Sequence, residues 1–237
     1  MTPIPTNLMT IEGLPVDRSF FAYQYEWNTG PKSRNRVLTK MRQAGADFFF
    51  AYEALNDALH TGRNQIFLCC NTASAQVIKA YVSAFLSQAA AYTHTGKIKS
   101  GKNHLELPNG AVIYFFDLKC HATALSGNVY VSEYAWSESP RNMIALAKGI
   151  SMHARHHATY YTTPSPNPEA WQEYKKLSRN KSVTSMVFTA DDAAASGAML
   201  FTDNWLNDMK KELSAEDWKM LFMCEWPWPF ANEELAE

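Results

Sequence analysis

Apolar residues recur along the chain in short runs that alternate with longer stretches of helical spacing. The short runs predict strands, at 36–41, 65–70, 128–133, 158–163 and 181–188. The longer stretches have apolar residues three or four positions apart and predict helices, at 46–62, 72–92, 139–154, 168–178, 203–213 and 215–223. Two further runs flank Pro108-Asn109-Gly110, which predicts a β-hairpin across 104–117.

Strands that are separated by helices imply βαβ units, so we expect an α/β fold with a mostly parallel sheet flanked by helices. Open sheets of this kind bind ligands at the carboxyl ends of their strands. Three strand ends with polar residues therefore become candidates for a site, at 40–47, 131–134 and 162–165.

The first strand runs into a turn that contains basic residues and a glycine and then into a helix. Lys40, Arg42 and Gly45 lie in this turn, and Asp47 opens the helix. Free backbone N–H groups and the helix dipole favour a phosphate at such a place. The spacing differs from the usual GxxxxGK[ST] phosphate loop. An ordinary strand-to-helix turn with a surface lysine and arginine is therefore the competing interpretation.

Three other places complete the candidate site. A buried strand ends at Ser132-Glu133, where a carboxylate can polarise a water molecule for attack on a phosphate. Another strand ends at Thr162-Thr163, which puts hydroxyl groups beside the same edge of the sheet. Gln24 lies among aromatic residues before the first strand and can recognise an adenine edge. The alternatives are a neutralising glutamate, a proline-terminated turn and a hydrophobic segment that packs on the sheet.

Together these segments resemble the ATPase half of the large terminase subunits of tailed phages. The resemblance extends from about residue 20 to 226 and is closest to the subgroup whose motor begins with a Lys-x-Arg-Gln-x-Gly-Ala-Thr loop. It rests on KMRQAGAD (40–47), YEALNDALHTGRNQIFL (52–68), LPNGAVIYF (107–115), SGNVYVSEYAW (126–136), KGISMHARHHATYYTTPS (148–165) and SAEDWKMLFMCEW (214–226).

The resemblance implies a P-loop NTPase fold of the ASCE/RecA-like type with a small C-terminal subdomain. It divides the chain into an N-terminal segment with an adenine motif (1–30), an ATPase core (31–168) and a C-terminal subdomain or connector (169–237). The nuclease domain of complete large terminases is expected to be absent.

The resemblance also implies a role for each candidate residue. Lys40 would bind phosphate, Arg42 would stabilise charge in cis, and Glu133 would be the catalytic carboxylate. Thr162 and Thr163 would belong to the coupling motif. The implied ATP-binding residues are Gln24, Lys40, Arg42, Gln43, Gly45, Ala46 and Asp47, with ATP and Mg²⁺ as cofactors.

Two positions depart from the family pattern. Asp47 stands where the family has a Thr or Ser that ligates Mg²⁺, and Ser132 stands where it has an acidic residue. One interpretation is that the site is dead. The other is a reciprocal exchange that keeps one acid, one hydroxyl and their hydrogen bond next to the metal, since Mg²⁺ needs oxygen ligands from either side. Against the exchange, a carboxylate at residue 47 would lie close to a phosphate and repel it.

The function that the resemblance implies is an ATP-driven motor that packages phage DNA. Its partners would be double-stranded DNA, small terminase and portal proteins, and further copies of the chain in a ring. The alternative is a catalytically degenerate module that docks on packaging proteins and interferes with them or redirects them. The sequence shows no secretory signal and no membrane-spanning run, so we expect the cytoplasm of a bacterial host and no membrane partner.

The net charge of −1 excludes a protein that is basic throughout, so any DNA contact has to come from a local patch. The candidate patch lies just before the Thr162-Thr163 strand and consists of Lys148, His153, Arg155, His156 and His157. A solvated polar surface explains the same residues equally well.

Overall fold

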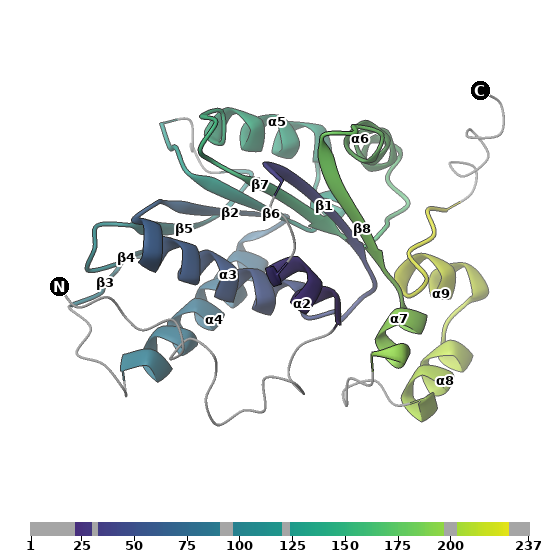
Figure 1. The fold of residues 1–237 in the computed structure, drawn as a ribbon. Coiled ribbons are helices and arrows are strands. Elements are labelled where there is room, and N and C mark those ends of the chain that lie inside the picture. Colours follow the sequence, from purple (N-terminus) through teal and green to yellow (C-terminus); the bar gives the residue numbers. More distant parts are fainter. Residues whose placement is uncertain (1–21, 30–32, 91–96, 120–123, 197–202, 228–237) are drawn as a thin grey trace.

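The computed structural model describes residues 22–29, 33–90, 97–119, 124–196 and 203–227. Of the predicted N-terminal segment 1–30, only 22–29 falls within these described residues. The centre of the fold is a sheet of eight strands in the order β3-β4-β5-β2-β6-β7-β1-β8 (Figure 1). The strands are β1 (Asn35–Lys40), β2 (Gln65–Cys69), β3 (Lys99–Ser100), β4 (His104–Glu106), β5 (Val112–Asp117), β6 (Asn128–Ser132), β7 (Ala158–Thr162) and β8 (Val183–Phe188). The helices are α2 (Ala22–Thr29), α3 (Ala46–Thr61), α4 (Thr72–Ala90), α5 (Pro140–Ile150), α6 (Pro168–Ser178), α7 (Ala190–Ala195), α8 (Asp203–Glu212) and α9 (Ala215–Leu221).

Six neighbouring strands, from β5 to β8 in the sheet order, run parallel, and β4 joins β5 antiparallel through the predicted hairpin. The expected mostly parallel α/β sheet is therefore confirmed. Strand β1 lies between β7 and β8, and β7 lies beside β6. This order brings the carboxyl ends of β6, β7 and β1 together at one edge, where the polar strand ends were predicted.

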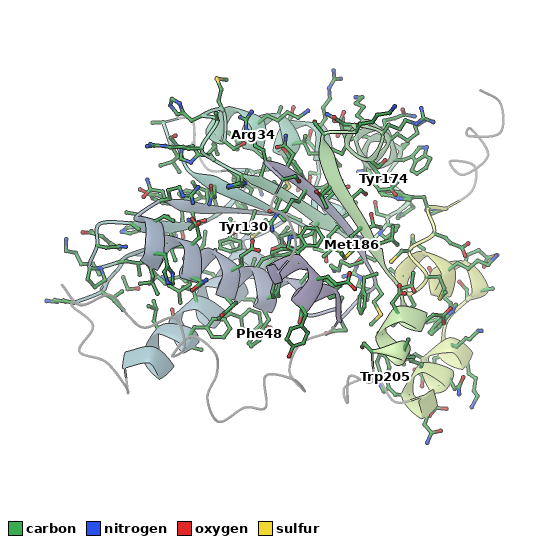
Figure 2. All side chains as sticks on the ribbon, viewed as in Figure 1. Arg34, Phe48, Tyr130, Tyr174, Met186 and Trp205 are labelled. Atoms are coloured by element: carbon green, nitrogen blue, oxygen red, sulfur yellow. The ribbon has the colours of Figure 1, made fainter. Side chains whose placement is uncertain are left out.

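Helices cover both faces of the sheet. Helices α2, α3 and α4 lie on one face and α5 and α6 on the other, while α7, α8 and α9 lie beside the end of β8 (Figure 1). Side chains fill the space between sheet and helices on both sides, with Phe48 on the side of α3 and Tyr174 on α6 (Figure 2). The buried apolar residues form two clusters, one containing Phe50 and Phe67 and the other Val131 and Tyr160. Burial on both faces explains why the central strands are apolar throughout instead of alternating.

The predicted element ends agree with local chemistry in most cases. Helix α3 ends before Gly62, which adopts a left-handed conformation with φ of 70°. Helix α7 begins with a capping box between Thr189 and Asp192, so the acidic pair Asp191-Asp192 lies in a first helical turn. The helix expected over 139–154 is shorter, because it ends at Ile150 and the chain then turns toward β7. Among the helices that the structure describes, none has the length and apolarity needed to cross a bilayer.

Candidate functional site

The turn between β1 and α3 forms a concave loop of backbone amides. Gln43 and Gly45 both adopt left-handed conformations, with φ of 63° and 68°. The amides of residues 43–47 donate no hydrogen bond within the part of the chain that the structure describes. Successive free amides that alternate with left-handed residues make an anion-binding nest, and the N-terminus of α3 adds its dipole. The loop therefore has the features of a phosphate site.

Two amides before this nest are already occupied. The N–H of Met41 donates to the carbonyl of Phe188 and that of Arg42 to the carbonyl of Leu221, both at 2.8 Å. These bonds tie the base of the loop to the end of β8 and to α9. The C-terminal part of the chain thus holds the loop in position, although nothing in the loop sequence indicates it.

A buried ion pair lies at the centre of the site. The ammonium group of Lys40 contacts Glu133 Oε1 and donates to Thr163 Oγ1 at 3.0 Å. The amide of Thr163 donates to Glu133 Oε2 at 3.0 Å. Glu133 itself has a φ of 52°, a conformation that is strained for any residue with a side chain and is common at functional sites. Three residues predicted from separate strand ends are therefore in direct contact.

Asp47 and Ser132 also meet. Ser132 Oγ donates to Asp47 Oδ1 at 2.8 Å, and the hydroxyl of Tyr161 donates to the same oxygen at 2.7 Å. No described residue donates to Asp47 Oδ2. The hydrogen bond that a reciprocal exchange requires is present, and one carboxylate oxygen remains available. The role of the pair in binding a metal stays a prediction.

The surroundings shift the acidity of Asp47 in a definite direction. Burial raises the pKa of this carboxyl, and the negative charge of Glu133 raises it further. Lys40 and the hydroxyls of Tyr161 and Ser132 act in the opposite direction but leave the pKa above its ordinary value. A cation next to Oδ2 would offset this penalty. A carboxylate and a hydroxyl are suitable donors for Mg²⁺, which usually takes one or two protein oxygens and completes its shell with water and phosphate.

Gln24 on α2 lies behind the loop. Its side-chain nitrogen is near the hydroxyl of Tyr23 at 3.0 Å and the carbonyls of Gly45 and Ala44 at 3.2 and 3.4 Å. The glutamine is 2% exposed, so it supports the backbone of the loop from beneath. Recognition of adenine by Gln24 stays a prediction.

A cavity of about 230 Å³ opens in front of the loop. All the predicted loop residues from Lys40 to Asp47 that carry a role line it, together with Glu133. Ser74 and Tyr81 of α4 form the other wall. Thr162 lies deeper, where its hydroxyl accepts from the amide of Ala135 at 3.2 Å.

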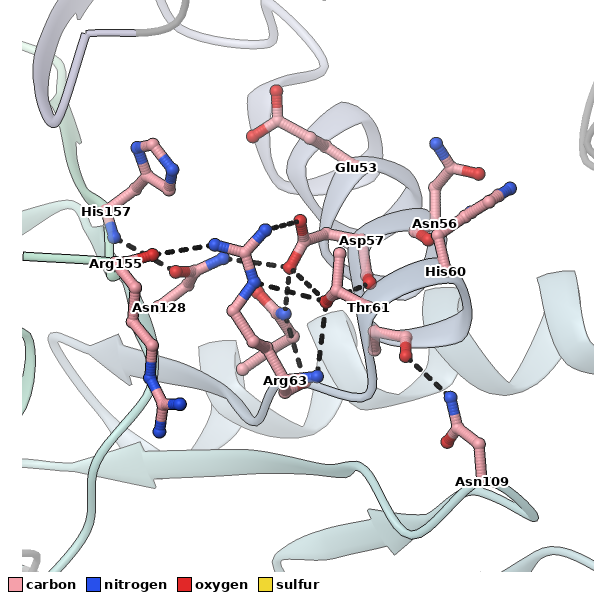
Figure 3. A network of polar contacts seen from close by, with 12 residues as sticks. Glu53, Asn56, Asp57, His60, Thr61, Arg63, Asn109, Asn128, Arg155 and His157 are labelled. Carbon is pink, nitrogen blue, oxygen red and sulfur yellow. Dashed lines mark hydrogen bonds and ion pairs between the residues drawn. The ribbon is translucent and has the colours of Figure 1, made fainter.

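The basic stretch lies at the opposite edge of the sheet, because it precedes the first residue of β7. Figure 3 shows Arg63 between Asp57 and the backbone carbonyl of Arg155, with the side chain of Arg155 turned away from this network. His156 is buried and contacts Ser126 Oγ at 3.1 Å, so it cannot reach a phosphate backbone. Lys148, His153 and Arg155 are exposed. A second cavity, of about 330 Å³, lies at this edge and is lined by Lys148 with Arg34 and Lys176.

Sequence reasoning missed two residues of the site. Tyr161 holds Asp47, and Trp136 contacts both Arg42 and Thr163. Tyr161 pairs with Ser132 in the register of β6 and β7, which local sequence does not reveal. Trp136 follows Glu133 by three residues, and its proximity was the only available signal.

A phosphate-binding turn after β1, a carboxylate at the end of β6 and this strand order define a P-loop ATPase fold of the ASCE type. The family model described as terminase large subunit, T4likevirus-type, N-terminal, matches residues 37–234. The chain therefore belongs to the terminase large subunit family, as the resemblance of its motifs indicated.

Two curated relatives agree with this assignment. The terminase ATPase subunit of Escherichia phage P2 is 30% identical over 234 residues, covering 86% of this chain and 38% of the relative. The probable terminase ATPase subunit of Haemophilus phage HP1 is 28% identical over 240 residues, covering 90% and 38%. The chain thus spans well under half the length of both relatives.

Solved structures share the fold at low sequence identity. The large terminase ATPase domain of Thermus phage P74-26 matches with a TM-score of 0.66 at 12% identity, covering 96% of this chain and all of that domain. The HK97 large terminase matches with 0.67 at 12%, covering 86% of this chain and 50% of that one. The large terminase of another thermophilic bacteriophage, solved in complex with ATP-γ-S, also matches with 0.67 at 12%, covering 87% and 53%.

Proposed function

We propose that this chain binds Mg-ATP at the β1–α3 loop and hydrolyses it as the motor part of a phage DNA-packaging machine. The row of free amides at residues 43–47, facing Lys40 and Glu133 across one cavity, carries the proposal. Family membership supports the packaging role, and one large terminase with this fold has been solved with an ATP analogue. Double-stranded DNA, small terminase, portal and a ring of copies are the partners proposed with it.

Each residue has a role that follows from its place. The nest and Lys40 would bind phosphate oxygens, and Arg42 at the mouth of the cavity would stabilise charge on them. When Lys40 exchanges its contact with Glu133 for a phosphate, Glu133 Oε1 becomes available to accept a proton from water. Asp47 and Ser132 would hold Mg²⁺, which neutralises charge on the phosphates when bound. Thr163 links Lys40 and Glu133 and would report the change to β7.

Calorimetry with Mg-ATP and turnover with and without duplex DNA test the proposal. We expect wild type to bind nucleotide and K40A to lose binding. The isosteric variant E133Q should keep binding but lose at least about 100-fold in turnover, since a positioned base contributes 10²–10⁴-fold. Exposed Glu138 lies in the segment that follows, and E138Q serves as the matched control with unchanged turnover.

Absence of binding at millimolar nucleotide would overturn the proposal. It would instead favour the degenerate module, which a stable complex with small terminase or portal protein in the absence of turnover would support.

A further inference from the structure

The turn after Glu133 is bound closely to the end of β7. This turn is the short helix η2 (Tyr134–Trp136). The amide of Ala135 donates to Thr162 Oγ1 at 3.2 Å, and Ser165 Oγ donates to the carbonyl of Ala135 at 2.7 Å. Because β6 ends at this turn, the predicted catalytic carboxylate and the end of β7 form one hydrogen-bonded unit.

Trp136 extends this unit toward the phosphate loop. Its indole N–H donates to the carbonyl of Thr163 at 3.0 Å. The guanidinium of Arg42 lies over its ring, 4.4 Å from the ring centre. The side chain is 38% exposed, so apolar burial does not explain its placement fully. One residue thus contacts the loop on one side and β7 on the other.

Every polar group of Thr163 is bound by a residue of the candidate site. Its amide donates to Glu133, its hydroxyl accepts from Lys40, and its carbonyl accepts from Trp136. A displacement of Thr163 therefore has to change at least one of these three contacts. Two of them lead directly to the predicted catalytic and phosphate-binding groups, and the third leads through Trp136 to Arg42.

We infer that Trp136 is a positioning residue, whose ring holds Arg42 at the cavity and whose N–H makes Thr163 respond to the state of Arg42. The inference rests on the proposed function. Arg42 lines the cavity while it lies on the ring. Holding a long side chain where its ligand binds reduces the rotamer freedom that binding removes. The ring therefore raises nucleotide affinity, and the N–H carries the signal to β7.

Two substitutions separate the contacts. W136F keeps an aromatic face for Arg42 and removes the donor to Thr163, whereas W136L removes both. A cation–π contact contributes about 0.5–2 kcal/mol, so W136L should weaken Mg-ATP binding by about 2- to 30-fold, while W136F stays within about 2-fold. Losing one hydrogen bond contributes about 0.5–1.5 kcal/mol, so W136F should lower DNA-stimulated kcat by about 2- to 10-fold at an unchanged KM.

Fluorescence gives a readout that a purely structural tryptophan would not change. The emission of wild type should shift when Mg-ATP is added, because Arg42 contacts the ring, and this shift should be absent from W136F. Trp218 on α9 has the ammonium group of Lys210 over its ring at 5.7 Å, so W218F is the matched control and should behave as wild type in every assay. Circular dichroism verifies that each variant is folded.

The outcomes separate the two claims. Wild type that binds no nucleotide overturns the proposed function and this inference together. Wild type that binds, with W136F and W136L equal to it in affinity, DNA-stimulated kcat and fluorescence shift, overturns the inference alone. Equal losses in W136F and W218F also overturn it.

Discussion

Exchanging the acid and the hydroxyl at residues 47 and 132 tests whether they form one unit. Ser132 is fully buried, and its Oγ lies 2.8 Å from Asp47 Oδ1. The variant S132D would place a second carboxylate against the first. Two unit charges about 4 Å apart repel by about 4 kcal/mol at an effective dielectric constant of 20. Protonation of one acid relieves part of this, so we expect a loss of about 2–4 kcal/mol in the free energy of unfolding.

The double variant D47T/S132D should recover this loss, because a single carboxylate again faces a hydroxyl. D47T alone removes the acceptor of two hydroxyl donors but also an acid whose burial is unfavourable, so its change should stay near about 1 kcal/mol. The isosteric variant S132N has the size of aspartate without its charge. The difference between S132D and S132N therefore measures the repulsion separately from steric strain.

Urea unfolding of the wild type and the four variants gives these free energies, without and with millimolar Mg²⁺. A cation that binds the two carboxylates should restore stability to S132D more than to S132N, because binding to the folded state alone adds stability. Calorimetry should then find Mg-ATP binding in wild type and the double variant and weaker binding in D47T. Additive effects of D47T and S132D, or equal stability of S132D and S132N, would refute the exchange.

Three further predictions concern stability, pH and DNA. The buried carboxylate of Glu53 accepts two hydrogen bonds from Arg36, at 2.5 and 3.0 Å, so E53Q should cost about 3–5 kcal/mol in urea unfolding because it leaves a buried charge unpaired. Burial lowers the pKa of His156, so the folded state resists protonation and stability falls as pH drops below about 6.5, whereas H156Q should lose this acid sensitivity in unfolding curves from about pH 7.5 to 5. Exposed Lys148 and Arg155 are proposed to contact duplex DNA, and K148A/R155A should reduce the slope of log K against log salt by about 1–2 in binding titrations.

Matched controls exist for all three. D208N breaks an exposed ion pair with Lys211 and should change stability by less than about 1 kcal/mol. H60Q replaces an exposed histidine and should keep the wild-type pH profile. K211A removes a lysine from α8 and should leave the salt slope unchanged. An E53Q effect as small as that of D208N, an H156Q profile parallel to wild type, or equal slopes for K148A/R155A and wild type would each contradict the corresponding reasoning.

Local sequence determined the elements and the candidate strand ends. Apolar spacing and Gly62 set the extent of α3, and Pro108-Asn109-Gly110 set the hairpin. These signals act over a few residues, so a single chain segment contains all the information they need. The same holds for the loop motif from Lys40 to Asp47, which carried the resemblance to the terminase family.

Tertiary structure alone decided which of these parts meet. The insertion of β1 between β7 and β8 brings Lys40 to Glu133 and Thr163, and it results from packing of the whole sheet. The bond from Arg42 to the carbonyl of Leu221 joins segments at opposite ends of the described chain. The burial of His156 removed it from a patch that sequence placed on the surface. Such contacts depend on strand order and register, which satisfy long-range packing and leave no periodic trace in the sequence.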